Sequence, residues 1–407
     1  MSTSLLYHAW GVRGYQQTRV RFVAGVVEFT VEQGPGTLRC GHCGSRRVMR
    51  QGQVTRRFKA IPIGSKPVAI VLPIPRLWCA ACSKTRQAKV AFADERRTYT
   101  RSFEQYALEL SRRMTIQGVA KHLGVSWDMV KDIQKRYLQK HFSRPRLKDL
   151  RQIAIDEISI GKGHRYLTVV LDLDSGAVVF VGEGKGADSL NPFWKKLFCA
   201  TRGRPKIRAV ATDMSAAYTL AVAERLPEAV HVFDRFHVVK LYNDKLADLR
   251  REVQRSTENI EHKQLLKGTL WLLLKNSENL DTDRDERKRL NEALRINQPL
   301  ATAYYMKEDL RQFWDQGGKR TARRFLNDWI ARAESSGIRM LKTFANTLRQ
   351  HMKGLLAWYN YPISTGPLEG TNNKIKTMQR QAYGFRDPVF FRLKIFALHR
   401  TSYKLIG

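Results

Sequence analysis

Hydrophobic and polar positions divide the chain into parts with different periodicities. Residues 1–95 contain short apolar stretches interrupted by Gly and Pro, including 56–63 and 68–72, which predict β-strands. Residues 96–150 instead carry apolar side chains at intervals of three and four, which predict helices. The sequence therefore predicts a small β module followed by a helical region.

From residue 151 the pattern alternates between strands and helices. The predicted strands cover residues 153–160, 165–172, 177–181, 207–213 and 229–233, and the predicted helices cover residues 190–200 and 216–225. Short links join the first three strands, whereas helices join the later ones, and this is the element order of an RNase H-like fold. We expect residues 151–240 to form the first part of such a core.

The remaining pattern is helical. Residues 241–361 are too many for a bare RNase H-like core, and their periodicity predicts an all-helical insertion. Residues 362–407 would then supply the C-terminal helices of the core. The expected fold class is multidomain α/β: a zinc-binding β module, a helix-turn-helix and an RNase H-like core interrupted by helices.

Charge adds an expected partner to this picture. The 407 residues include 72 Lys and Arg against 37 Asp and Glu, a formal net charge of +35. Residues 1–150 hold 28 of the basic residues and only 9 of the acidic ones. Such an excess on a chain with 43% hydrophobic residues predicts a folded protein that binds a polyanion, most often nucleic acid.

Four of the five cysteines lie in two Cys-x-x-Cys pairs, Cys40/Cys43 and Cys79/Cys82. Two such pairs can offer four thiolates in tetrahedral geometry to one structural zinc ion. The 35 intervening residues are predicted strands and turns, which would bring the pairs together. The alternatives are a disulfide pair or unrelated cysteines. Basic residues near the pairs are candidates for phosphate contact: Arg46, Arg47, Arg56 and Arg57.

The segment 116–133 has the pattern of a helix-turn-helix. Apolar residues recur at helical spacing, Gly124 would form the turn, and Ser126 would cap the second helix. Ser102, with Gln105 three residues later, predicts the cap of a preceding helix. An ordinary αα-hairpin fits the pattern almost as well. In the DNA-binding interpretation, the outward residues of the recognition helix would include Trp127, Lys131 and Lys135.

Two acidic residues fall at informative positions in the predicted sheet. Asp156 lies inside the first strand, and Asp213 ends the fourth, which neighbours the first in an RNase H-like sheet. A carboxylate within a buried strand is costly unless it is paired, protonated or bound to metal. Oxygen ligands suit Mg²⁺, and two such ions would serve phosphodiester displacement. That chemistry calls for a third acid.

Glu369 is the candidate third acid. Pro367 predicts a helix start, and Glu369 then falls in the first turn, where the helix dipole favours an anion. Basic and polar residues follow at 4, 7 and 11 positions on the same face: Asn373, Lys376 and Arg380. They are candidate DNA contacts. The alternative is an ordinary surface helix with an acidic first turn.

These motifs together resemble one family. The runs 156–166, 212–215, 233–237 and 368–377, with the cysteine pairs and the helix-turn-helix, are similar to the IS-L-three family of bacterial insertion-sequence transposases, in the DDE superfamily. The resemblance covers essentially the whole chain. It implies that Asp156, Asp213 and Glu369 bind two Mg²⁺ or Mn²⁺ ions, and that the protein cleaves DNA at terminal inverted repeats and joins the 3′ ends to target DNA.

The resemblance also implies roles for three further residues. Asp234 and His237 match an Asp-x-x-His signature, with expected roles behind the metal ligands or at the DNA end. Related enzymes carry a helical insertion in which a Trp can stack on a base; Trp271 is the candidate here, with a buried core residue as the alternative. The expected partners are double-stranded DNA and a second copy of the chain, in a homodimer or higher synaptic assembly.

Two alternative functions stay open at this point. A non-enzymatic zinc and helix-turn-helix regulator would explain the charge and the cysteines, and an RNase H-like nuclease without strand transfer would explain the acids. No membrane span or secretory signal is visible, which predicts a soluble intracellular protein. The resemblance implies that this protein is bacterial, cytoplasmic and associated with the nucleoid.

Overall fold

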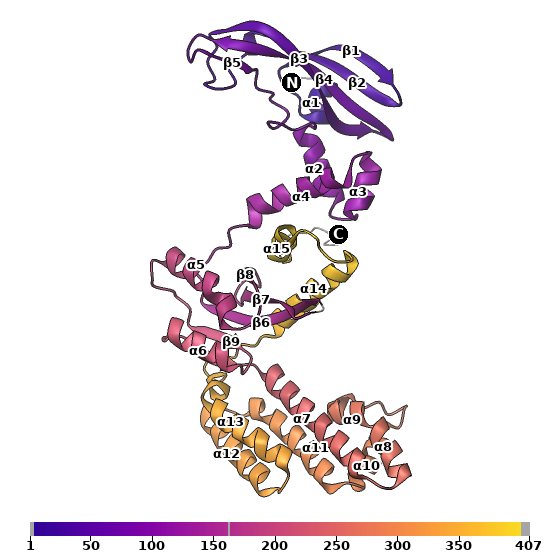
Figure 1. Ribbon diagram of the computed structural model, residues 1–407, viewed down its shortest axis with the longest axis vertical. Helices are drawn as coiled ribbons and strands as arrows, with labels where there is room; N and C mark the ends of the chain where they lie inside the picture. Colours follow the sequence, from indigo (N-terminus) through magenta and orange to yellow (C-terminus); the bar gives the residue numbers. More distant parts are fainter. Residues whose placement is uncertain (1–3, 162, 400–407) are drawn as a thin grey trace. The chain divides into compact units, whose positions relative to one another are not determined.

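Strand pairing and helix packing divide the chain into two units, which are described separately. The structure is a computed structural model that describes residues 4–161 and 163–399. One unit contains residues 4–143 and 378–394, and the other contains residues 144–377 and 395–399 (Figure 1). No helix among the described residues is long and apolar enough to cross a membrane.

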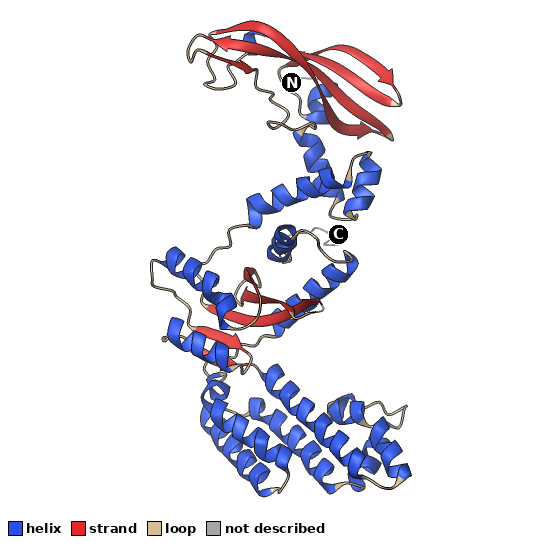
Figure 2. Ribbon diagram, viewed as in Figure 1, coloured by secondary structure: helices blue, strands red, loops and turns tan. Residues whose placement is uncertain are grey.

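The first unit begins with a short helix and a five-stranded sheet (Figure 2). These elements are α1 (Leu5–Trp10), β1 (Tyr15–Val23), β2 (Val26–Gln33), β3 (Val48–Ile63), β4 (Lys66–Cys79) and β5 (Lys84–Gln87). The sheet order is β1-β2-β4-β3, and β5 also pairs with β4. Inward side chains of β4, among them Ile70, Leu72 and Ile74, pack with Phe58 and Trp10 in one core.

Three helices follow in the first unit: α2 (Arg101–Leu110), α3 (Ile116–Leu123) and α4 (Trp127–Phe142). The prediction that Ser102 caps α2 is wrong. Thr100 is the cap, and its hydroxyl accepts a hydrogen bond from the Phe103 amide at 3.1 Å. Both residues suit a cap, but Thr100 is held at the end of an extended segment by backbone bonds to Lys59, so the helix begins earlier.

The second unit is built on a five-stranded mixed sheet. Its strands are β6 (Gln152–Gly161), β7 (Arg165–Asp172), β8 (Val178–Glu183), β9 (Ala209–Thr212) and β10 (Val230–Phe233), in the order β10-β9-β6-β7-β8. β6, β7 and β8 form an antiparallel meander, whereas β9 and β10 run parallel to β6. α5 (Asn191–Thr201) and α6 (Ala216–Arg225) connect the later strands.

Helices fill the chain between β10 and the C-terminal segment (Figure 2). They are α7 (Arg235–Ser256), α8 (Ile260–Gly268), α9 (Leu270–Leu274), α10 (Glu286–Arg295), α11 (Gln298–Arg311), α12 (Lys319–Ser335) and α13 (Arg339–Ala357). Their core contains Tyr242, Trp329 and Phe344, whose ring centroids lie 4.8–6.1 Å apart with steep interplanar angles. Two more helices follow, α14 (Gly366–Gln381) and α15 (Pro388–Ala397).

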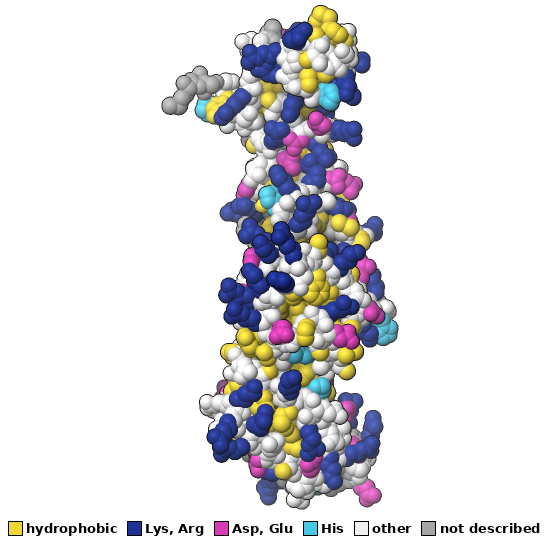
Figure 3. All heavy atoms as spheres, turned by 90° about the vertical axis from the view of Figure 1, so that its left-hand side faces the viewer, with side chains coloured by type: hydrophobic (Ala, Val, Ile, Leu, Met, Phe, Trp, Pro, Cys, Tyr) yellow, Lys and Arg dark blue, Asp and Glu magenta, His cyan; other side chains and the backbone are white. Residues whose placement is uncertain are grey.

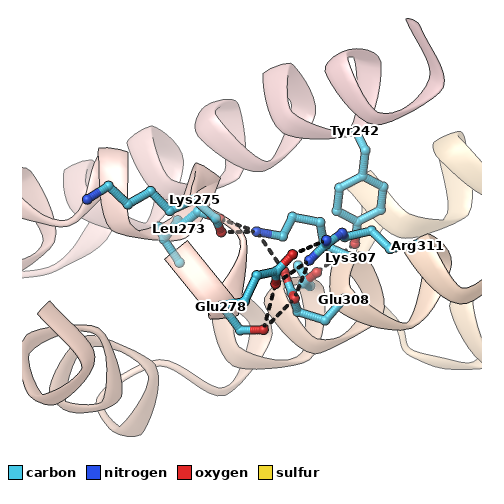
Figure 4. A network of polar contacts seen from close by, with 9 residues as sticks. Tyr242, Leu273, Lys275, Glu278, Lys307, Glu308 and Arg311 are labelled. Atoms are coloured by element: carbon cyan, nitrogen blue, oxygen red, sulfur yellow. Dashed lines mark hydrogen bonds and ion pairs between the residues drawn. The ribbon is translucent and has the colours of Figure 1, made fainter. Parts of the chain in front are cut away.

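A buried lysine joins α11 to the end of α9 (Figure 4). Lys307 is 2% exposed, and its Nζ donates to the carbonyls of Leu273 and Lys275 at 2.8 Å each. The same nitrogen lies 3.0 Å from a carboxylate oxygen of Glu308. Burial lowers the pKa of Lys307, whereas Glu308 opposes this shift. The ammonium thus satisfies carbonyls that the C-terminus of α9 leaves without helical partners.

Replacing Lys307 by Ala should lower the free energy of unfolding by about 3 kcal/mol, because two carbonyls and a carboxylate lose their buried partner. Denaturant unfolding of the full chain, followed by the loss of helical circular dichroism, measures the change. Lys342→Ala is the matched control, since Lys342 is an exposed helical lysine and should change stability by less than about 0.5 kcal/mol. Equal effects of the two substitutions would contradict the role of Lys307.

Candidate active site and DNA-binding modules

The four predicted zinc ligands meet at one end of the first sheet. Cys79 ends β4, Cys82 follows in the turn to β5, and Cys40 and Cys43 form the turn before β3. Their Sγ atoms all lie within 4.8 Å of one another, with 3.7 Å between Cys40 and Cys82 and 3.5 Å between Cys43 and Cys79. Sulfurs about 2.3 Å from a tetrahedral zinc ion are about 3.8 Å apart, so the cluster fits that metal.

Electrostatics within the cluster also favour a cation. The backbone amides of Cys43 and His42 lower the pKa of Cys40 to about 6. Burial, together with the three neighbouring sulfurs, raises the pKa of Cys82 to about 12. Four thiolates therefore cannot form side by side without a positive charge between them, and all four cysteines are free of disulfides. This excludes the disulfide alternative in the described structure.

The helix-turn-helix residues take the predicted local conformations. Gly124 is left-handed at the end of α3, with a φ of +60°, and the Ser126 hydroxyl caps α4 by accepting from the Met129 amide at 3.2 Å. Trp127 is 40% exposed at the start of α4. Lys131 and Lys135 are half-buried and both pair with Asp387, at 3.3 and 2.8 Å. The two lysines therefore already have an acidic partner within the first unit.

The candidate arginines near the cysteines differ in their surroundings. Arg46 and Arg47 are exposed in the loop before β3. Arg57 pairs with Glu28 at 2.8 Å, and Arg56 donates to the Arg97 carbonyl while lying over the Phe58 ring. Lys and Arg side chains are spread over the face of each unit that Figure 3 shows. The first two arginines are therefore the ones most available to a phosphate.

Strand register brings two of the predicted catalytic acids together. β6 and β9 pair in parallel, with Gln152 opposite Ala209 and Ala154 opposite Ala211. Two residues beyond the Ala154–Ala211 pair, the same register would set Asp156 opposite Asp213. Asp213 follows the last residue of β9, and its carboxylate accepts a hydrogen bond from the Ser215 amide at 3.0 Å. Asp213 therefore follows the end of β9 beside Asp156 in the middle of β6.

Asp156 occupies an environment that disfavours its charge. Burial raises the pKa of Asp156; the Asp213 carboxylate adds to this effect, whereas the Glu157 amide and His237 oppose it. The Glu157 amide donates to Asp156 Oδ1 at 2.8 Å. An ionised carboxylate in this place is stabilised by a bound cation, which is the behaviour expected of a metal ligand.

The third predicted acid, Glu369, is half-buried in the first turn of α14. One turn later, Asn372 Nδ2 donates to Asp156 Oδ2 at 2.8 Å, which places this part of α14 against β6. Sequence reasoning missed Asn372 and chose Asn373, which is exposed together with Lys376 and Arg380. The helical periodicity held a signal for this choice: neighbouring positions differ by about 100° around the axis, and the spacing of Leu368 and Ile375 places position 372 on the buried face.

The three acids are less closely grouped than the cysteines. Within the described ranges, only the four cysteines bring at least three candidate ligand atoms within 4.8 Å of one another. The residue types and their shared location still suit Mg²⁺, whose ligands are carboxylate oxygens and water.

Asp234 connects the end of the sheet to the start of α14. It is 1% exposed, its amide donates to the Thr212 carbonyl, and its Oδ2 accepts a hydrogen bond from the Thr365 hydroxyl. The Thr365 carbonyl in turn accepts from the Glu369 amide at 2.8 Å. A side chain so buried has no surface for DNA. His237, in the first turn of α7, is half-buried.

Trp271 lies on α9 and is 73% exposed. The alternative that it belongs to the core is therefore wrong. Its neighbours Leu272 and Leu273 supply the apolar contacts of this short helix instead. The amphipathic pattern 271–274 permits either orientation when read alone, and the packing of α9 on α7 selects the two leucines.

Three family comparisons cover nearly the whole described chain. Residues 153–395 match a family described as transposase, residues 88–138 match the helix-turn-helix domain of transposase family ISL3, and residues 37–82 match the zinc-finger of transposase IS204/IS1001/IS1096/IS1165. These matches replace the αα-hairpin alternative with a DNA-binding helix-turn-helix, and they support a structural zinc site at the cysteine cluster.

Relatives agree with the family comparisons. The transposase for insertion sequence element IS1001 of Bordetella parapertussis is 34% identical over 360 residues, covering 88% of each chain. The transposase for IS1557 of Mycobacterium tuberculosis is 30% identical over 374 residues, covering 86% of this chain and 83% of that one. A solved Drosophila P element transposase strand transfer complex aligns over 77% of this chain, with 12% identity and a TM-score of 0.40.

The class of protein follows from these matches: it is a DDE transposase, an enzyme of polynucleotidyl transfer that binds DNA. Within that class, the chain belongs to the ISL3 family of insertion-sequence transposases. The non-enzymatic regulator considered above is therefore set aside.

The zinc site is tested by metal analysis of the purified chain. Wild-type protein should contain about one zinc ion per chain, and Cys40→Ser/Cys79→Ser should lose it because only two thiolates remain. Cys199→Ser is the control, since Cys199 is exposed and outside the cluster, and it should keep its zinc. A folded, zinc-free wild-type protein would refute the assignment.

Proposed function

We propose that this transposase binds the terminal inverted repeats of its insertion sequence, cleaves the DNA at the element's ends and joins the freed 3′ ends to target DNA. The observation that carries the proposal is the β6–β9 register, which leads Asp213, just after β9, to Asp156 in the middle of β6. The bond from Asn372 to Asp156, with Glu369 one turn earlier on α14, adds the third acid.

The core that holds these acids is proposed to be RNase H-like. Its strand order β8-β7-β6-β9-β10 combines an antiparallel meander with two parallel strands, as the element order predicts. The proposed domains are residues 1–95 and 96–150 for DNA binding, 151–240 and 362–407 for the core, and 241–361 for the insertion. The helices α7–α13 support the all-helical character of the last of these.

Asp156, Asp213 and Glu369 are proposed to hold two Mg²⁺ or Mn²⁺ ions. When bound, the ions would supply stabilisation of the attacking and leaving oxygens of an in-line phosphodiester displacement. The carboxylates act as ligands and not as nucleophiles, so the attacking groups are water in cleavage and the 3′ hydroxyl in joining. Asp234 would hold the start of α14 through Thr365, which keeps Glu369 at the site.

The basic residues are proposed to hold the DNA in two places. Arg46, Arg47, Arg56, Arg57 and the α4 residues Trp127, Lys131 and Lys135 would bind the ends. Asn373, Lys376 and Arg380, exposed on α14, would hold DNA near the acids. Because two ends must be joined together, a homodimer or larger synaptic assembly on nucleoid DNA is expected.

Cleavage and joining of end-bearing DNA with Mg²⁺ test this function. Asp213→Ala should reduce both reactions at least about 100-fold, because even residues behind metal ligands contribute about 10- to 100-fold. Asp174→Ala, an exposed turn residue, should retain wild-type activity. Cleavage without joining would instead indicate a nuclease that lacks strand transfer, and equal activity of wild type and Asp213→Ala would overturn the catalytic assignment.

Trp271 is proposed to stack on an unpaired base close to the cleavage point. Its exposed ring is carried by α9, whose end is fixed by Lys307. Trp271→Ala should weaken binding of end DNA with unpaired bases about 5- to 150-fold, the range given by a stacking energy of about 1–3 kcal/mol. Trp271→Phe should recover most of the affinity. Binding unchanged in Trp271→Ala, measured by titration at fixed salt, would refute the contact.

A further inference from the structure

Asn372 holds an unusual position beside the proposed metal ligands. It is 4% exposed on α14, and its Nδ2 lies 2.8 Å from Asp156 Oδ2. An ionised carboxylate only accepts hydrogen bonds, so the amide nitrogen must face Asp156 and the amide oxygen must face away from that contact. This orientation follows from chemistry, because the opposite one would set two acceptors against each other.

The amide oxygen of Asn372 is left without a partner. Asn372 Oδ1 is one of the few buried side-chain polar atoms in the described residues that have no hydrogen-bond partner. Buried acceptors in native proteins are almost always satisfied, so an unpaired one beside a site points to a donor that arrives with a ligand. A hydrated divalent cation brings such donors, because Mg²⁺ keeps several of its waters when it binds protein.

Packing of α14 does not depend on Asn372. Leu368 and Ile375, one turn to either side, are fully buried, and Thr371 bonds to the Pro367 carbonyl and to His399. The two apolar side chains and the Thr371–His399 bond hold the helix against its neighbours, whereas the bond to Pro367 lies within the helix. A large buried amide with one satisfied end therefore has little structural purpose of its own at this position.

We propose that Asn372 is a positioning residue for the divalent cation held by Asp156. Its amide nitrogen fixes the Asp156 carboxylate in orientation, and its amide oxygen accepts a hydrogen bond from a water of the ion's hydration shell. The inference rests on the proposed function, since it assumes that Asp156 is a metal ligand. Groups behind metal ligands that orient them commonly contribute 10- to 100-fold to metal affinity.

Mn²⁺ binding to the full-length protein tests this role without requiring activity. Electron paramagnetic resonance of free Mn²⁺ gives the dissociation constant. Asn372→Ala should raise that constant about 10- to 100-fold. Asn327→Ala is the control: it removes the same side chain from an exposed position of α12, to which no role in the site is assigned, and should bind Mn²⁺ like wild type. Asp156→Asn should abolish binding at the site.

A second variant separates positioning from packing and serves if Asn372→Ala does not fold. Asn372→Leu keeps the size of the buried side chain but removes both the donor to Asp156 and the acceptor for a metal-bound water. Added Mn²⁺ should raise its melting temperature by fewer degrees than it raises that of wild type, because the Asp156 carboxylate is no longer held. A purely structural amide would leave the Mn²⁺-induced shift of this variant equal to that of wild type, and this result would overturn the inference.

The remaining outcomes distinguish the two proposals. If Asp156→Asn loses Mn²⁺ binding while Asn372→Ala binds like wild type, the role of Asn372 is refuted and the proposed catalytic site stands. If wild type binds no Mn²⁺, or Asp156→Asn binds as wild type does, the metal assignment of the acids fails and the inference falls with it.

Discussion

The parallel pairing of β6 with β9 is the constraint on which the rest of the site depends. It sets Asp213 beside Asp156 in a sheet whose interior residues Ile153, Ala154 and Ile155 are fully buried. Hydrogen bonds and apolar packing stabilise this register, while repulsion between Asp156 and Asp213 opposes it. Packing of the sheet therefore keeps two carboxylates in place whose repulsion a cation, or protonation of one of them, would relieve.

The position of Glu369 depends on the return of the chain to the sheet after a long helical segment. The sheet ends at Phe233, and the chain passes through the helices α7–α13 before Thr365 bonds back to Asp234. Helix α13 packs tightly on the end of β10, because a Cβ atom added to Gly354 would lie only 2.4 Å from the Phe233 ring. Packing of the helical segment on β10 thus sets where α14 begins, and with it the position of Glu369.

Patterns within a short stretch of sequence predict those structural features that depend on neighbouring residues. Strand periodicity located Asp156 and Asp213, and paired spacing located the four cysteines, because each depends on a few neighbouring residues. Side-chain contacts and orientations that depend on tertiary packing could not be predicted from these patterns. Helix spacing places Asn372 on the buried face but does not reveal its contact with Asp156, and it leaves Trp271 either buried or exposed. In these cases contacts with distant elements select the orientation.

Ion pairs that form only in the folded structure limit what the net charge predicts about DNA binding. A cation contributes to salt-dependent binding by replacing counterions on phosphate, and one that already pairs with a carboxylate must first give up that partner. Lys131 and Lys135 share Asp387, whose pKa their hydrogen bonds help lower to about 2 despite burial, whereas Lys376 is exposed with no ion-pair partner among the described residues. DNA at α4 would therefore have to compete with Asp387. The excess of +35 overstates the charge that is free to bind, and the unpaired positions carry most of its effect.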